Sequence, residues 1–80
     1  MPVILRYKGY KFFFFSNEGN PREPLHVHVR RDEATAKFWI EPQVALAESY
    51  GLSGSELNEL AKAVADNRQL IEGAWYEFFG

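Results

Sequence analysis

Apolar and polar residues alternate along the first half of the chain, a pattern typical of strands. Residues 3–7 and 10–16 predict two strands, and the Lys8-Gly9 pair between them predicts a turn, because glycine permits the chain reversal. The segment NEGNPREP, residues 17–24, is rich in Asn, Gly and Pro and predicts a loop.

The pattern continues through residue 50. LHVHVR, residues 25–30, predicts a third strand, Arg31 to Ala34 a turn, and TAKFWI, residues 35–40, a fourth strand. Residues 44–50 leave two alternatives, since apolar positions two apart fit a short edge strand but a helical turn fits as well. We therefore expect an antiparallel meander of four to five strands.

A helix is indicated after this meander. Ser53 and Glu56 have the spacing of a capping box, and apolar residues then recur at steps of three and four without loss of phase. We expect one amphipathic helix from about Gly54 to about Phe79, on the order of 39 Å long at 1.5 Å per residue. Gly73 and the DNR stretch, residues 66–68, leave a kink or a split as the alternative.

These elements predict an α+β fold, with one long C-terminal helix packed on one face of the sheet. The 80 residues form a single domain, 1–80, with a sheet half at 1–50 and a helix half at 51–80. A chain of this size buries only about 60% of its unfolded surface, so the core must be thin.

Four consecutive phenylalanines, Phe12 to Phe15, raise the question of what covers each face of the sheet. Side chains on a strand alternate between faces, so Phe12 and Phe14 share one face, and Phe13 and Phe15 the other. Parity gives the helix side the apolar residues Val27, Val29, Ala36, Phe38 and Ile40, together with one Phe pair. It gives the opposite side His26, His28, Arg30, Thr35, Lys37, Trp39, Arg6 and the other Phe pair. One helix cannot cover this second side as well, so we expect it to meet a partner.

The amino-acid composition limits the kinds of site, the cellular location and the charge of the partner that we expect. The absence of cysteine excludes disulfides and thiolate metal sites, and no segment is apolar and long enough to be a signal sequence or a membrane span, so we expect a cytoplasmic protein. The net charge is −2, but residues 1–40 hold seven basic and four acidic side chains, net +3, whereas residues 41–80 hold two and seven, net −5. Such asymmetry fits a basic surface for an anionic partner; the alternative is a simple difference in composition between strands and helices.

The segment HVHVRR, residues 26–31, is the sharpest chemical feature. Two histidines two apart on a strand project side by side, so His26 and His28 are candidates for general acid–base cleavage of an RNA phosphodiester, and Arg30 for holding the phosphate. A metal site is the alternative, with Glu18 or Glu23 as a third ligand, and a structural role on a half-exposed sheet is another. We expect no cofactor and no resident metal.

The remaining candidates are contacts to RNA or to a protein partner. They are Arg6, Lys37, Trp39, Arg31, Phe12 and Phe14. Asn67 falls on the apolar stripe of the helix, which is typical of a kink or of a contact that fixes register across a dimer.

The residues also carry a resemblance. The segment MPVILRYKGYKFFFFSNEGNPREPLHVHVRR, the AKFWIEP that follows and the tail LSGSELNELAKAVADNRQLIEGAWYEFFG are similar to the small prokaryotic domain-of-unknown-function family numbered 4160. The resemblance covers nearly the whole chain and implies a compact bacterial protein, encoded beside a second small domain and assigned to toxin-antitoxin modules. It implies no activity for His26, His28 or Arg30.

Two functional hypotheses follow. In the first, the chain is a toxin-antitoxin component, the toxin, whose basic aromatic face contacts RNA or is masked by an acidic, antitoxin-like small protein. In the second, it is a non-enzymatic interaction module or homodimer, in which a Phe pair and Trp39 form a protein interface.

Overall fold

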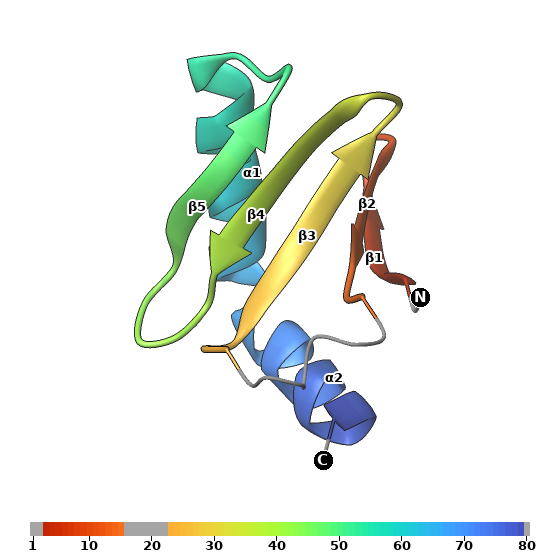
Figure 1. The fold of residues 1–80 in the computed structure, drawn as a ribbon, viewed down its shortest axis with the longest axis vertical. Coiled ribbons are helices and arrows are strands. Elements are labelled where there is room, and N and C mark those ends of the chain that lie inside the picture. Colours follow the sequence, from red (N-terminus) through yellow and green to blue (C-terminus); the bar gives the residue numbers. More distant parts are fainter. Residues whose placement is uncertain (1–2, 16–22, 80) are drawn as a thin grey trace.

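The computed structural model describes residues 3–15 and 23–79, and these residues form an α+β fold (Figure 1). The strands are β1 (Val3–Tyr7), β2 (Tyr10–Phe13), β3 (His26–Arg31), β4 (Ala34–Trp39) and β5 (Ala45–Tyr50). They form one antiparallel sheet in the order β1-β2-β3-β4-β5, which confirms the predicted meander. The helices α1 (Gly54–Asp66) and α2 (Arg68–Phe79) follow.

The first turn sets the register of β1 and β2. Lys8 at φ 49° and Gly9 at φ 84° both have positive φ, as a type I′ turn requires. Because this turn has only two central residues, Tyr7 pairs with Tyr10. β2 ends at Phe13, three residues before the predicted end; Ser16 lies outside the described residues.

The second turn is shorter than the sequence pattern suggested. β3 extends to Arg31 and β4 begins at Ala34, and these two residues pair. Asp32, the first of the two residues between them, has φ 55°, as in a type II′ turn. The register of β3 against β4 is therefore fixed by this tight connection.

The segment for which the sequence left two alternatives is a strand. β5 pairs antiparallel with β4, with a register shift between Lys37 and Phe38. All six residues of β5 are exposed. Since β5 is the last strand of the sheet, one of its edges pairs with no strand in the described part of the chain.

The expected single helix is instead two helices that meet at Asn67. This residue has φ −111° and ψ 19°, and its side-chain Nδ2 donates to the carbonyl oxygen of Ala63 at 2.8 Å. The amide therefore caps the last turn of α1, and α2 starts in a new direction (Figure 1). The break lies at the centre of the DNR stretch, whereas Gly73 lies inside α2.

The core lies between the helices and one face of the sheet. In Figure 1, α1 lies behind β4 and β5, and α2 lies below the strands. The five residues that parity placed here are buried, although Ile40 directly follows β4: Val27, Val29, Ala36, Phe38 and Ile40. The helices contribute Leu60, Ala63, Val64, Ile71 and Trp75.

The four phenylalanines are divided between the two faces. Phe12 and Phe14 are fully buried, and the ring of Phe14 lies 5.1 Å from that of Trp75, edge to face. Phe13 and Phe15 belong to the other face, where their rings are 5.3 Å apart. The placement of Phe12 and Phe14 on a partner surface is thus corrected, because these are the two that the helices cover.

This division predicts unequal costs for two neighbouring substitutions. Phe14→Ala removes a fully buried ring and should lower the free energy of unfolding by about 3–5 kcal/mol, whereas Phe15→Ala should lower it by less than about 1 kcal/mol. Urea denaturation of the two variants measures the difference. Equal losses would mean that the assignment of the two faces is wrong.

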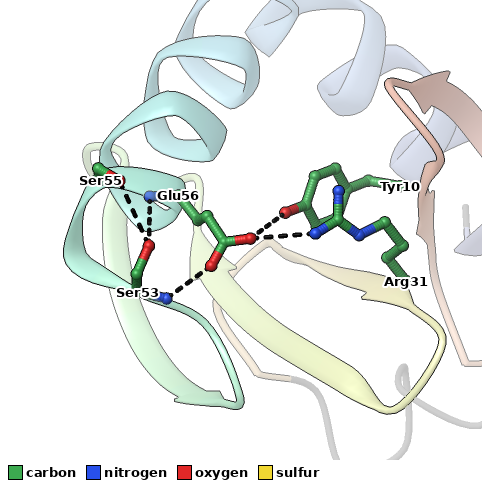
Figure 2. A network of polar contacts seen from close by, with 5 residues as sticks. All are labelled: Tyr10, Arg31, Ser53, Ser55 and Glu56. Atoms are coloured by element: carbon green, nitrogen blue, oxygen red, sulfur yellow. Dashed lines mark hydrogen bonds and ion pairs between the residues drawn. The ribbon is translucent and has the colours of Figure 1, made fainter.

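A polar network joins the start of α1 to the sheet (Figure 2). The predicted capping box is confirmed: the Glu56 N–H donates to the Ser53 hydroxyl at 3.1 Å, and the Ser53 N–H donates to Glu56 Oε1 at 2.9 Å. Glu56 Oε2 accepts from Arg31 Nη2 at 3.0 Å and from the Tyr10 hydroxyl at 3.2 Å. One carboxylate therefore caps the helix and ties it to β2 and β3.

These contacts favour the charged carboxylates. Hydrogen bonds from Ser53 hold the pKa of Glu56 below its ordinary 4.5. On the next turn, hydrogen bonds from Lys8, at 2.6 Å, and from Tyr7, at 2.9 Å, lower the pKa of Glu59 in the same direction. Burial raises the pKa of the Tyr10 hydroxyl.

The lowered pKa values predict acid sensitivity. A carboxyl whose folded pKa lies below its unfolded value stabilises the fold at pH above about 4.5, and this contribution is lost as the pH falls through the folded pKa. We expect the free energy of unfolding to fall between pH 5 and 3, by less in Glu56→Gln than in wild type. Urea denaturation across this range measures it, with Glu77→Gln on the exposed end of α2 as the charge-matched control. An unchanged slope in Glu56→Gln would contradict the role of this carboxylate.

Candidate functional site

One face of the sheet carries no helix in the described part of the chain, and we call it the open face (Figure 1). The strand register places its side chains in rows that run across the sheet. The first row is Arg6, Lys11, Arg30, Thr35 and Tyr50, one residue from each strand. The second is Phe13, His28, Lys37 and Glu48, and the third is His26, Trp39 and Ala45.

The first row begins with three cations, Arg6, Lys11 and Arg30, which we call the cation row. Neighbouring strands lie about 4.8 Å apart, so the three side chains start within about 10 Å of one another. All three are exposed, and none forms an ion pair within residues 3–15 and 23–79. Arg30 Nε donates to the backbone oxygen of Asp32 at 2.9 Å. Because like charges directly opposite each other destabilise a sheet, the cation row suits an anionic ligand.

Aromatic rings lie beside the cation row. The His28 ring is 5.7 Å from Phe13, in a stacked arrangement, and 4.5 Å from Phe15. Phe15 is 43% exposed, and Tyr50, at the far end of the first row, is 71% exposed. The open face therefore offers rings on which a flat ligand can stack.

The two histidines come together, but only one reaches the surface. Their rings are 5.2 Å apart, yet His26 is 1% exposed. Its ring lies 5.6 Å from that of Trp39 and 5.3 Å from that of Trp75, which α2 places below the start of β3. Nδ1 of His26 donates to the carbonyl oxygen of Pro24 at 2.9 Å. The expected exposure of His26 is thus corrected, because α2 reaches past the end of the sheet.

Arg31 lies on the helix side of the sheet. Its Nη2 is 3.0 Å from Glu56 Oε2, and its guanidinium lies 4.3 Å from the centre of the Tyr10 ring. The expected binding role of the Arg31 guanidinium is corrected by parity, since neighbours on a strand point to opposite faces; Arg31 borders the open face only near the turn between β3 and β4.

Lys37 and Trp39 lie together on the open face as predicted. The Lys37 ammonium is 4.6 Å from the centre of the Trp39 ring and 3.0 Å from Glu23 Oε1. The side chain of Lys37 is only 16% exposed. Lys37 thus connects β4 to the segment before β3, and its ammonium lies toward Trp39 of the third row.

Two hollows lie side by side on the open face. The first, which we call the aromatic pocket, holds about 450 Å³ and is lined by Phe13, Phe15, His28, Val29, Arg30, Thr35, Ala36, Lys37, Glu48, Ser49 and Tyr50. The second, the basic pocket, holds about 430 Å³ and is lined by Val3, Gly9, Lys11, Phe13, Arg30, Arg31 and Asp32. Phe13 and Arg30 border both, so one ligand can extend from one pocket into the other.

The histidine pair does not form part of a metal-binding cluster among the described residues, where no three His, Cys, Asp or Glu side chains gather. Glu23 Oε1 lies 4.0 Å from His26 Nδ1, but this nitrogen is already hydrogen-bonded to the carbonyl oxygen of Pro24, and the Glu23 carboxylate pairs with Lys37. Glu18, the other carboxylate considered as a third ligand, lies outside the described residues.

Sequence reasoning missed three residues of the open face: Lys11, Glu48 and Tyr50. The Lys8-Gly9 turn could have identified Lys11, since a two-residue turn sets Arg6 opposite it. Glu48 and Tyr50 could not be placed, because residues 44–50 fitted both a strand and a helical turn.

The charge asymmetry between the halves of the chain becomes an asymmetry between two sides of the sheet. The cations of the open face lie opposite the helix side, where Glu56 and Glu59 of α1 pair with Arg31 and Lys8.

Neither helix of the described chain has the length and apolar character needed to cross a bilayer.

Comparison with family models gives one match. The model described as a domain of unknown function (DUF4160) matches residues 9–76, which include β2 to β5, α1 and most of α2. Comparisons with curated proteins and with solved structures found no match. Because the match spans most of the sequence, the chain belongs to the DUF4160 family.

Proposed function

We propose that the open face binds single-stranded RNA. The observation that carries this proposal is the cation row, three exposed cations on adjacent strands without an ion pair among the described residues, close to the exposed ring of Phe15 and the His28 ring that packs against it. Phosphates bind Lys and Arg, and unstacked bases bind exposed aromatic rings, so a sheet with both suits a nucleic-acid strand.

The shape of the face favours a single strand over a duplex. An A-form duplex presents phosphates and 2′-hydroxyls but keeps its bases stacked, so it cannot fill the aromatic pocket. A single strand can place its phosphates over the cation row and turn a base into the pocket.

The burial of His26 supports RNA binding rather than RNA cleavage. A general acid and a general base must both reach the substrate, and His26 is 1% exposed and packed against Trp75. His28 and Arg30 border the aromatic pocket and can touch a bound phosphate or base. We therefore assign these two residues to binding.

The toxin-antitoxin role stays a prediction that rests on the family resemblance. Within it, RNA is the target of the open face, and an acidic partner protein competes with RNA for the cation row. The cytoplasmic location is likewise a prediction.

A protein interface is the second candidate, and β5 favours it. This edge strand is exposed along all six residues, including Leu46 and Tyr50, and could pair with a strand of a partner or of a second copy. In that case removal of the cation row would leave the function unchanged.

The RNA proposal predicts a loss of affinity and of salt dependence. Fluorescence anisotropy of a labelled ten-nucleotide oligo(U) measures both in wild type, Lys11→Ala and Arg30→Ala. Each variant should lose a phosphate contact, which lowers the slope of log K against log salt by about 0.7. Lys62→Ala, which removes an exposed cation from α1, should bind as wild type does.

Two outcomes would contradict this proposal. One is that wild type fails to bind the oligonucleotide at low salt. The other is that Lys62→Ala weakens binding as much as Arg30→Ala, since RNA would then be attracted without reference to the open face.

A further inference from the structure

We infer that the aromatic pocket takes a guanine base and that Glu48 reads its Watson–Crick edge. This inference rests on the proposed RNA binding and adds a base preference to it. The observation behind it is a carboxylate in a pocket whose other charged residues are basic and whose largest side chains are aromatic, among the described residues.

Glu48 is placed by the sheet register. It lies on β5 opposite Lys37, in the second row of the open face. Within residues 3–15 and 23–79, it is the one carboxylate that lines the aromatic pocket, and it forms no ion pair there. Lys37, its cross-strand neighbour, instead pairs with Glu23 at 3.0 Å.

A carboxylate repels phosphate, so its place on this face must suit a different part of the nucleotide. The backbone has its own site, since Lys11 and Arg30 line the basic pocket on the other side of Phe13. Because Arg30 borders both pockets, a nucleotide whose phosphate lies at Arg30 can place its base toward β4 and β5, where Glu48 is. The two pockets therefore separate phosphate from base.

The hydrogen-bonding capacity of Glu48 selects among the bases. An ionised carboxylate only accepts, through two oxygens. Guanine presents two adjacent donors, N1–H and the N2 amino group, which can engage both oxygens at once. Adenine and cytosine each offer one amino group beside a ring acceptor, and uracil offers one N–H between two carbonyl oxygens, so each meets the carboxylate with at least one acceptor.

Lys37 can donate to O6, the third polar group on the Watson–Crick edge of guanine. O6 of guanine is an acceptor next to N1–H, and Lys37 lies beside Glu48 on the neighbouring strand. Its ammonium has three N–H donors, of which one points to Glu23 Oε1. Lys37 and Glu48 thus place one donor group and one acceptor group on neighbouring strands, the two kinds of group that the edge of guanine requires.

The aromatic rings supply the stacking. Of the rings that line the pocket, Phe15 and Tyr50 are 43% and 71% exposed, and a purine has the larger face to place against them, whereas Phe13 is buried at the floor of the face. The volume of about 450 Å³ lies within the 300–1,000 Å³ range of small-ligand sites.

The experiment compares oligo(U) with the same oligomer carrying one central G, A or C. Wild type should bind the G-containing oligomer about tenfold more tightly than the others, the discrimination expected of a bidentate base contact. Glu48→Gln should lose this preference while binding oligo(U) as tightly as wild type or more tightly, because a negative charge has been removed. Glu33→Gln, an exposed carboxylate at the turn between β3 and β4, is the matched control and should keep the preference.

The outcomes separate the two proposals. If wild type binds none of the oligomers, RNA binding itself is wrong. If it binds all four equally, RNA binding stands and the guanine inference fails. If the preference for G persists in Glu48→Gln, another residue reads the base, and Glu48 is only a charge that protects the sheet edge from pairing.

Discussion

The packing of two helices against one side of a five-stranded sheet is the constraint on which the other features depend. Phe14, Trp75 and the apolar residues of β3 and β4 fill the space between the layers, and no residue in 3–15 or 23–79 forms a third layer. The strand side chains of opposite parity therefore lie on the open face, apart from His26, which packs against Trp75 of α2. The aromatic rings and the cation row are gathered there because the core takes their neighbours.

Much of this arrangement could be predicted from two sequence periods, the two-residue alternation of strands and the three- and four-residue steps of helices. Alternation by two assigned Val27, Val29, Ala36, Phe38 and Ile40 to the core, and the capping box placed the start of α1. The same parity assigned His28, Lys37 and Trp39 to the opposite face, where the structure has them. Family membership was also readable from sequence, whereas the function of the family was not.

The remaining features depend on contacts that no period encodes. Apolar residues keep their phase through Asn67, so the pattern could not show that its amide bonds Ala63 and divides the helix. This division directs α2 beneath the start of β3, where Trp75 packs against His26. Whether Phe12 and Phe14 or their neighbours face the core depended on which side the helices pack. Because of the break at Asn67, the candidate site is not the predicted histidine pair. It consists instead of His28, Arg30 and the rows of residues around them.

The central claim is that the open face, and not the helix side, meets RNA. The most direct measurement is the change in backbone amide NMR shifts when an unlabelled oligonucleotide is added to ¹⁵N-labelled protein. The account predicts that shifts concentrate on Lys11, Phe13, His28, Arg30 and Tyr50, with α1 and α2 unaffected. Shifts confined to the helices, or spread evenly over both sides of the sheet, would contradict it.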